Sequence, residues 1–138
     1  MLSEAKRYLN DNHARLVIIK NKNITTSSKR GVKALLDLLD SKIDFSGSFA
    51  ADKVVGKAAA MIYVLLRVKE LYAAVISEGA KNIIENNEIR LEYDEVVPYI
   101  VNRAGDGMCP MEMAVGDETE PKKAVQKVRT RLAELKKG

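Results

Sequence analysis

Residues 58–66 constrain this chain more than any other part of its sequence. They read AAAMIYVLL and contain no charged side chain. The longer run from 53 to 66, KVVGKAAAMIYVLL, is apolar on nearly every helical face beyond Lys57. A helix without a polar face has to be covered on all sides, so we predict that residues 53–66 form the buried central helix of the domain. The small residues at 56 and 58–60 would permit close approach to a sheet.

The segments on either side predict helices and strands in alternation. An amphipathic helix is expected from the start of the chain to about residue 12, and a second over residues 32–39. A hairpin is expected over 15–26, with its turn at 21–23. Residues 70–76 and 88–93 read as strands on either side of a helix that Ser77 caps. This order predicts an α/β fold, a three-layer α/β/α sandwich with a mixed sheet.

Residues 43–51 read as a short strand or loop leading into Asp52, which we predict to be the N-cap of the central helix. Near the end of the chain, Cys109 and Pro110 open a short helix that Gly116 ends. From Pro121 the chain reads as a last helix with seven basic residues and one acidic residue.

Composition narrows the class of protein further. The 138 residues are 46% hydrophobic and 30% charged, which predicts a single domain over residues 1–138 with one core. Its net charge of +4 does not demand a nucleic acid partner, and its single cysteine cannot form an internal disulfide. The charged first 15 residues lack a long apolar stretch, so we expect a cytoplasmic protein that does not enter a membrane.

Four segments carry a resemblance to a known family. They are RGVKALLDLL, AADKVVGKAAAMI, YAAVIS and VPYIVNRAGDGMCPME, and together they cover about residues 29–115. In this order they resemble an uncharacterised prokaryotic "domain of unknown function" family, to which a cytidine-deaminase-like fold is assigned. The resemblance implies this fold and leaves the activity open.

The zinc chemistry of such a fold needs ligands that this chain does not place correctly. Zinc deaminases use a His/Cys-x-Glu element and a Pro-Cys-x-x-Cys element, each at a helix start. Residues 51–53 and 77–80 would occupy these positions, and neither segment has a histidine or cysteine. His13, which we interpret as structural, and Cys109 are the only other candidates. We therefore expect no metal site, and no cofactor is implied.

The same fold would bring helix N-termini to one edge of the sheet, where free N–H groups favour anions. Asp52 and Ser77 would mark this edge, and Lys53, Lys57 and Arg103 could bind a nucleotide phosphate. Lys53, if buried, could also act as a nucleophile or base. The alternative is that Asp52 is only a cap and the lysines form a solvated face.

Two further segments hold candidate residues. Cys109 is a candidate nucleophile because it stands at a helix start, and the alternative is that it packs as a small apolar residue. Glu112 is a candidate general acid or base, or a capping residue at the third position of its own helix. Asn102, Arg103 and Asp106 form a Gly-flanked loop that either closes over a ligand or is a solvated turn.

These observations leave two functions open, and whether the chain is an enzyme stays undecided. The first is binding of a nucleotide or other phosphate-bearing small molecule, in a pocket where the segments of Asp52, Ser77 and Cys109 converge. The second is a non-enzymatic regulatory or interaction protein, with RNA as a candidate partner of the basic helix 121–138. A homo-oligomer is expected, because a second subunit would help to cover the apolar segment 58–66.

Overall fold

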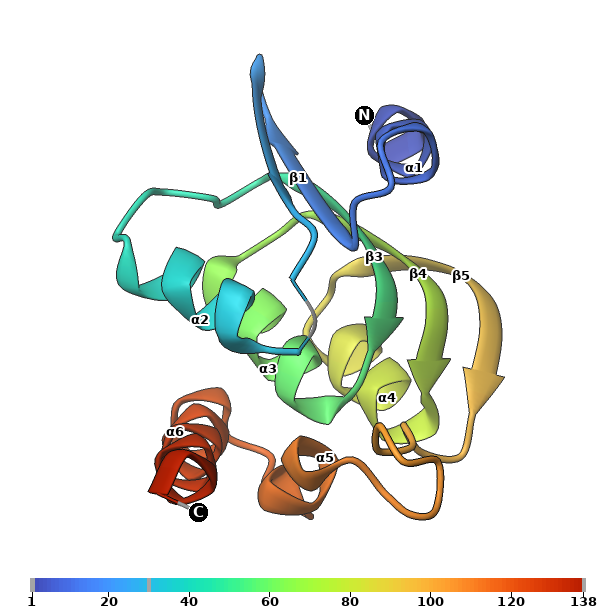
Figure 1. The fold of residues 1–138 in the computed structure, drawn as a ribbon. Helices are drawn as coiled ribbons and strands as arrows, with labels where there is room; N and C mark the ends of the chain where they lie inside the picture. The colour runs from blue at the N-terminus through green and yellow to red at the C-terminus, as the bar shows by residue number, and fades with distance from the viewer. Residues whose placement is uncertain (1, 30, 138) are drawn as a thin grey trace.

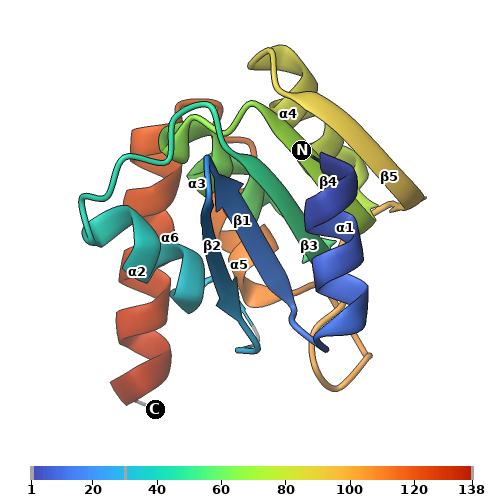
Figure 2. The ribbon, with the colours of Figure 1, turned by 90° about the horizontal axis from the view of Figure 1, so that it is seen from above.

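The structure is a computed structural model that describes residues 2–29 and 31–137. Its five strands form one sheet in the order β2-β1-β3-β4-β5 (Figures 1 and 2). The strands are β1 (Leu16–Lys20), β2 (Asn23–Ser27), β3 (Phe49–Val55), β4 (Glu70–Ser77) and β5 (Arg90–Val97). The helices are α1 (Leu2–Asp11), α2 (Lys33–Asp40), α3 (Lys57–Leu66), α4 (Glu78–Asn86), α5 (Pro110–Val115) and α6 (Pro121–Lys137).

The sheet is mixed, as the sequence predicts. β1 pairs with β2 and β3 in antiparallel directions, whereas β3, β4 and β5 run parallel. The antiparallel hairpin follows from the two-residue turn at 21–22, and the parallel strands follow from the helical crossovers α3 and α4. Because β3, β4 and β5 run the same way, the helices that follow β3 and β4 begin at the same edge of the sheet (Figure 1).

The helices cover the sheet in two layers. α1 packs on one face, where its Ala5 and Leu9 are fully buried against Val17, Ala51 and Tyr72. α3 and α4 cover the other face, and α2, α5 and α6 pack onto α3 from outside (Figures 1 and 2). Seven of the ten residues of α3 are buried, which confirms it as the central helix of the fold. No helix among the described residues has both the length and the apolar character to cross a membrane.

The start of the central helix is where the prediction was wrong. Asp52 is no N-cap, because β3 continues to Val55 and α3 begins at Lys57 after Gly56. β1 pairs with residues 49–52 and β4 pairs along the strand as far as Val55, so this segment is held as strand. The β-branched Val54 and Val55 also favour a strand. Ser77 is the N-cap of α4 as predicted, and its hydroxyl accepts a hydrogen bond of 3.2 Å from Ala80 N.

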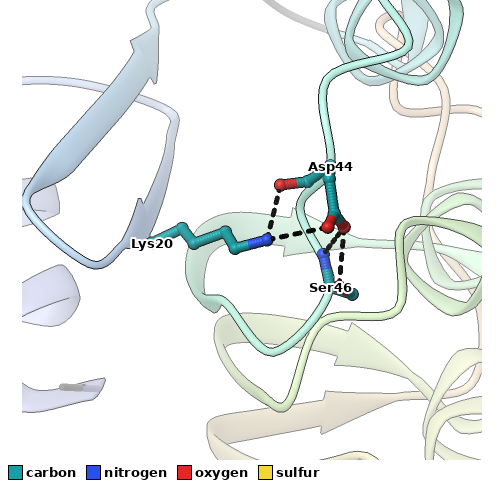
Figure 3. A network of polar contacts seen from close by, with 3 residues as sticks. All are labelled: Lys20, Asp44 and Ser46. Carbon is teal, nitrogen blue, oxygen red and sulfur yellow. Dashed lines mark hydrogen bonds and ion pairs between the residues drawn. The ribbon is translucent and has the colours of Figure 1, made fainter.

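A polar contact fixes the loop before β3 to the end of the hairpin (Figure 3). The Lys20 ammonium donates to Asp44 O at 2.8 Å and lies 3.2 Å from the Asp44 carboxylate. Ser46 donates to the same carboxylate from its backbone N at 2.9 Å and from its hydroxyl at 2.6 Å. These hydrogen bonds, those of Ser46 first, lower the pKa of Asp44 to about 2.

Candidate functional site

Three elements meet at the edge where the parallel strands β3 and β4 end. α3 begins after Gly56 and α4 begins after Ser77, because each helix follows a parallel strand directly. The short helix α5 lies across these starts, and its Glu112 touches both of them. The predicted convergence of helix starts therefore centres on the side chain of Glu112.

Glu112 is 2% exposed, and both oxygens of its carboxylate accept hydrogen bonds. Its Oε1 accepts from the backbone N of Lys57, the first residue of α3, and from the Ser77 hydroxyl at 3.0 Å. Its Oε2 accepts from Ile100 N at 3.4 Å. The N-terminus of a helix attracts an anion, and here the chain supplies that anion itself. The sequence left Glu112 as a candidate general acid or base or as a capping residue of its own helix; in the structure its carboxylate binds the start of a helix 55 residues earlier.

Close packing makes the fit around this carboxylate tight. A Cβ atom at position 56 would lie 2.6 Å from Glu112 Oε1, so only glycine leaves room for the carboxylate there. The aliphatic part of Lys57 packs over Gly79 in the same way. The Lys57 ammonium donates to Gly116 O at 2.9 Å, at the C-terminal end of α5, where a cation is favourable. Lys57 therefore helps to hold α5 against the starts of α3 and α4.

Asp52 lies in the interior of β3, and its hydrogen bonds belong to a separate buried pair. Its Oδ2 accepts from the Tyr63 hydroxyl of α3 at 2.6 Å, and its Oδ1 accepts from Val54 N at 3.3 Å. Burial raises the pKa of Asp52 to about 6, and the bond from Tyr63 limits this rise. Burial also raises the pKa of Tyr63 well above 10, and the neighbouring carboxylate adds to this. The pair links the sheet to the central helix.

Lys53 and Cys109 are both half-buried. Lys53 is a half-buried residue of β3, and its backbone N donates to Arg15 O at 3.0 Å. Cys109 is half-buried at the N-cap position of α5, and its side chain packs against the main core. This packing matches the interpretation of Cys109 as a small apolar residue.

The predicted polar loop is closed by its own hydrogen bonds. Asn102 Oδ1 accepts from Gly105 N at 2.8 Å and from Asp106 N at 3.2 Å, and its Nδ2 donates to the Asp106 carboxylate at 2.9 Å. Asn102 N also donates to Gly107 O at 2.8 Å. Arg103 is exposed. These contacts are those of a surface turn, which was one of the two interpretations of this loop.

Two surface depressions of the molecule lie away from Glu112. One, of about 240 Å³, runs beside β2 and α2, and the other, of about 390 Å³, lies between the start of α1 and the start of β5. None of the candidate site residues lines either of them. Over residues 2–29 and 31–137, no three His, Cys, Asp or Glu side chains lie together in a way that could hold a metal ion. The histidine, His13, is an exposed residue that follows α1.

Sequence reasoning missed two residues of these clusters. Tyr63 was read only as part of the apolar helix, and no local pattern pairs it with Asp52. Ile100 contributes only its backbone N–H to Glu112, which no side-chain motif reveals.

Comparison with known proteins places the chain in a family. The model of a domain of unknown function, DUF1893, matches residues 4–132. The crystal structure of a DUF1893 family protein, TM1506 from Thermotoga maritima, is similar to this chain with a TM-score of 0.87 and 27% identity. The similarity covers 94% of this chain and 88% of that one. No curated protein matches the sequence. Neither description names a cytidine deaminase, so the cytidine-deaminase-like fold label stays a prediction. The predicted resemblance to an uncharacterised family is confirmed, because the chain belongs to the DUF1893 family.

Proposed function

We propose that this chain is a non-enzymatic interaction protein, which acts through its surface. The observation that carries the proposal is the Glu112 carboxylate, which fills the position that a phosphate would need at the start of α3. A phosphate there would have to displace a buried carboxylate from three donors, or lie beside it as a like charge. Either arrangement is costly in a buried site.

One of the cations that the phosphate hypothesis needs already makes a structural contact. The Lys57 ammonium binds Gly116 O, and Arg103 extends from a loop closed by its own bonds. The Asp52 carboxylate accepts its hydrogen bonds from the Tyr63 hydroxyl and from Val54 N. These contacts support structural roles for the residues at this edge.

A protein partner is favoured over RNA by the surroundings of α6. Three of its basic side chains pair with acids: Lys123 with Glu120, Lys127 with Glu118 and Arg129 with Asp40. These acids reduce the positive charge that the helix offers to a phosphate backbone. The described part of α6 also has no aromatic side chain for base stacking.

Thermal unfolding with phosphate ligands tests the proposal. We expect ATP, GTP, CMP, ADP-ribose and inorganic phosphate to leave the Tm of the wild-type protein unchanged relative to sodium chloride of equal ionic strength. A bound ligand at a hundred times its Kd would add about 2.7 kcal/mol, which is a shift of several degrees.

The Glu112→Ala variant provides the matched comparison. It should unfold at a lower temperature, because the donors at Lys57, Ser77 and Ile100 lose their acceptor. Inorganic phosphate should restore part of this loss, since the emptied helix start attracts an anion. The proposal is overturned if a nucleotide raises the Tm of the wild-type protein and Lys57→Met abolishes the effect.

A further inference from the structure

The two outer edges of the sheet differ in how they are protected. β2 and β5 each pair with one neighbour, so each has one row of free backbone N–H and C=O groups (Figure 2). Proteins usually protect such edges with charged side chains. β5 has Arg90, Glu92, Asp94 and Glu95, whereas β2 reads NITTS and has no charge. Ile24 of β2 is in addition 42% exposed.

We propose that the free edge of β2 pairs with β2 of a second copy of this chain, in antiparallel directions, so that one sheet runs through a dimer. This inference rests on one element of the proposed function, which is that the chain acts through its surface. It goes further by naming that surface and its occupant.

Hairpin geometry fixes which groups of β2 face the free edge. Lys20 and Asn23 flank a two-residue turn, so they exchange the first hydrogen bonds of the β1–β2 pair. The alternation then directs the backbone groups of Thr25 and Ser27 toward β1, and Ser27 O does accept from Arg15 N at 2.9 Å. The backbone groups of Ile24 and Thr26 consequently face outward.

A two-fold axis at Thr25 uses all of these outward groups. It places Ile24 of each copy opposite Thr26 of the other, and both pairs can exchange hydrogen bonds in both directions. The two Thr25 residues then face one another at a site without hydrogen bonds, where side chains come closest. The strand is therefore complementary to itself.

The charges around β2 suit the same register. Lys22 would lie opposite Ser28 of the second copy, and Lys29 opposite Asn21, so that no like charges face each other across the axis.

The β5 edge lacks this complementarity. A two-fold pairing centred on Tyr93 would place Glu92 opposite Asp94, and one centred on Glu92 would place this carboxylate opposite its own copy. Like charges directly opposite one another destabilise a strand pair. β5 therefore provides the control positions.

Disulfide trapping tests the register. In a Cys109→Ser background, Thr25→Cys should form a covalent dimer under mild oxidation, seen on a non-reducing gel and reversed by reductant. Ile24→Cys should cross-link poorly, because Ile24 faces Thr26 of the second copy. Tyr93→Cys on β5 should give no dimer above the rate of random collision. Equal cross-linking at positions 25 and 93 would overturn the proposal.

Light scattering provides the second arm, without covalent chemistry. The wild-type protein should be a dimer. Thr25→Lys should be a monomer, because two lysines would meet at the two-fold axis. Tyr93→Lys, the control on β5, should stay a dimer. Circular dichroism confirms that the variants fold. A monomeric wild-type protein, or a dimer that Thr25→Lys leaves intact, overturns the β2 pairing alone. A rise in Tm with a nucleotide that Lys57→Met abolishes overturns the proposed function and leaves the pairing standing.

Discussion

Replacing Asp52 by asparagine should remove most of the pH dependence that this carboxyl group gives to the free energy of unfolding. Asp52 is 8% exposed, and its folded-state pKa of about 6 stands above the ordinary value of 3.8 because burial penalises the charged form. In the folded state the carboxyl therefore keeps its proton at a pH at which the unfolded chain has lost it.

The sign and size of the effect follow from this difference. Below about pH 4 the carboxyl is protonated in both states and contributes no pH dependence. As the pH rises to about 6, only the unfolded chain releases the proton, so the free energy of unfolding falls; above 6 it is constant again. Two pKa units correspond to about 3 kcal/mol, which is the loss expected between these limits.

Urea unfolding between about pH 4 and pH 8 measures this loss in the wild-type protein and in Asp52→Asn. The amide can still accept from Tyr63 but gives up the bond from Val54 N, so the variant should be about 1 kcal/mol less stable at the acidic end. At the neutral end it should be about 2 kcal/mol more stable than the wild type. A stability difference between the two proteins that does not change with pH would refute the reasoning.

Two contacts of different burial should respond very differently to substitution. Gly56→Ala should lower the free energy of unfolding by about 1–3 kcal/mol, because its Cβ would meet the buried Glu112 carboxylate. Gly107→Ala is the control: the nearest atom to its Cβ would be 3.6 Å away, so the free energy of unfolding should change by less than about 0.5 kcal/mol. Equal urea midpoints for the two variants would contradict the tight fit. Arg129→Ala should shift the urea midpoint far less than Gly56→Ala, because its ion pair with Asp40 is exposed, and the shift should vanish in high salt.

The parts of the fold that could be predicted are those that local sequence decides. An uninterrupted apolar helix has to be buried, so residues 58–66 identify the core helix on their own. The turn at 21–22 fixes an antiparallel hairpin, and the strand-helix-strand order over residues 70–97 fixes a parallel pair. Ser77 was predictable as an N-cap because its hydroxyl bonds to a residue three positions away.

The error at Asp52 arose from two interactions that local sequence does not show. Asp is a common N-cap, and the following VVGK suits a strand or a helix, so nothing nearby decides between them. The decision comes from β1, which pairs with residues 49–52, and from β4, which pairs with β3 as far as Val55. Tyr63 adds to it, because it binds the Asp52 carboxylate from within the central helix. Pairing with distant strands thus outweighed the local capping preference.

Glu112 illustrates why the candidate site could be located but not understood from the sequence. The order of the elements brings the starts of α3, α4 and α5 together, and that depends only on the topology. Whether the meeting point binds an external anion depends on one side chain, and Glu112 reaches it only because Gly56 lacks a side chain and Ile100 offers its backbone N. These three residues are 44 and 12 positions apart, so no local motif contains them. The local sequence is therefore the same for a helix start that is free to bind phosphate and for one that the chain's own carboxylate fills. Only the packing of α5 distinguishes the two.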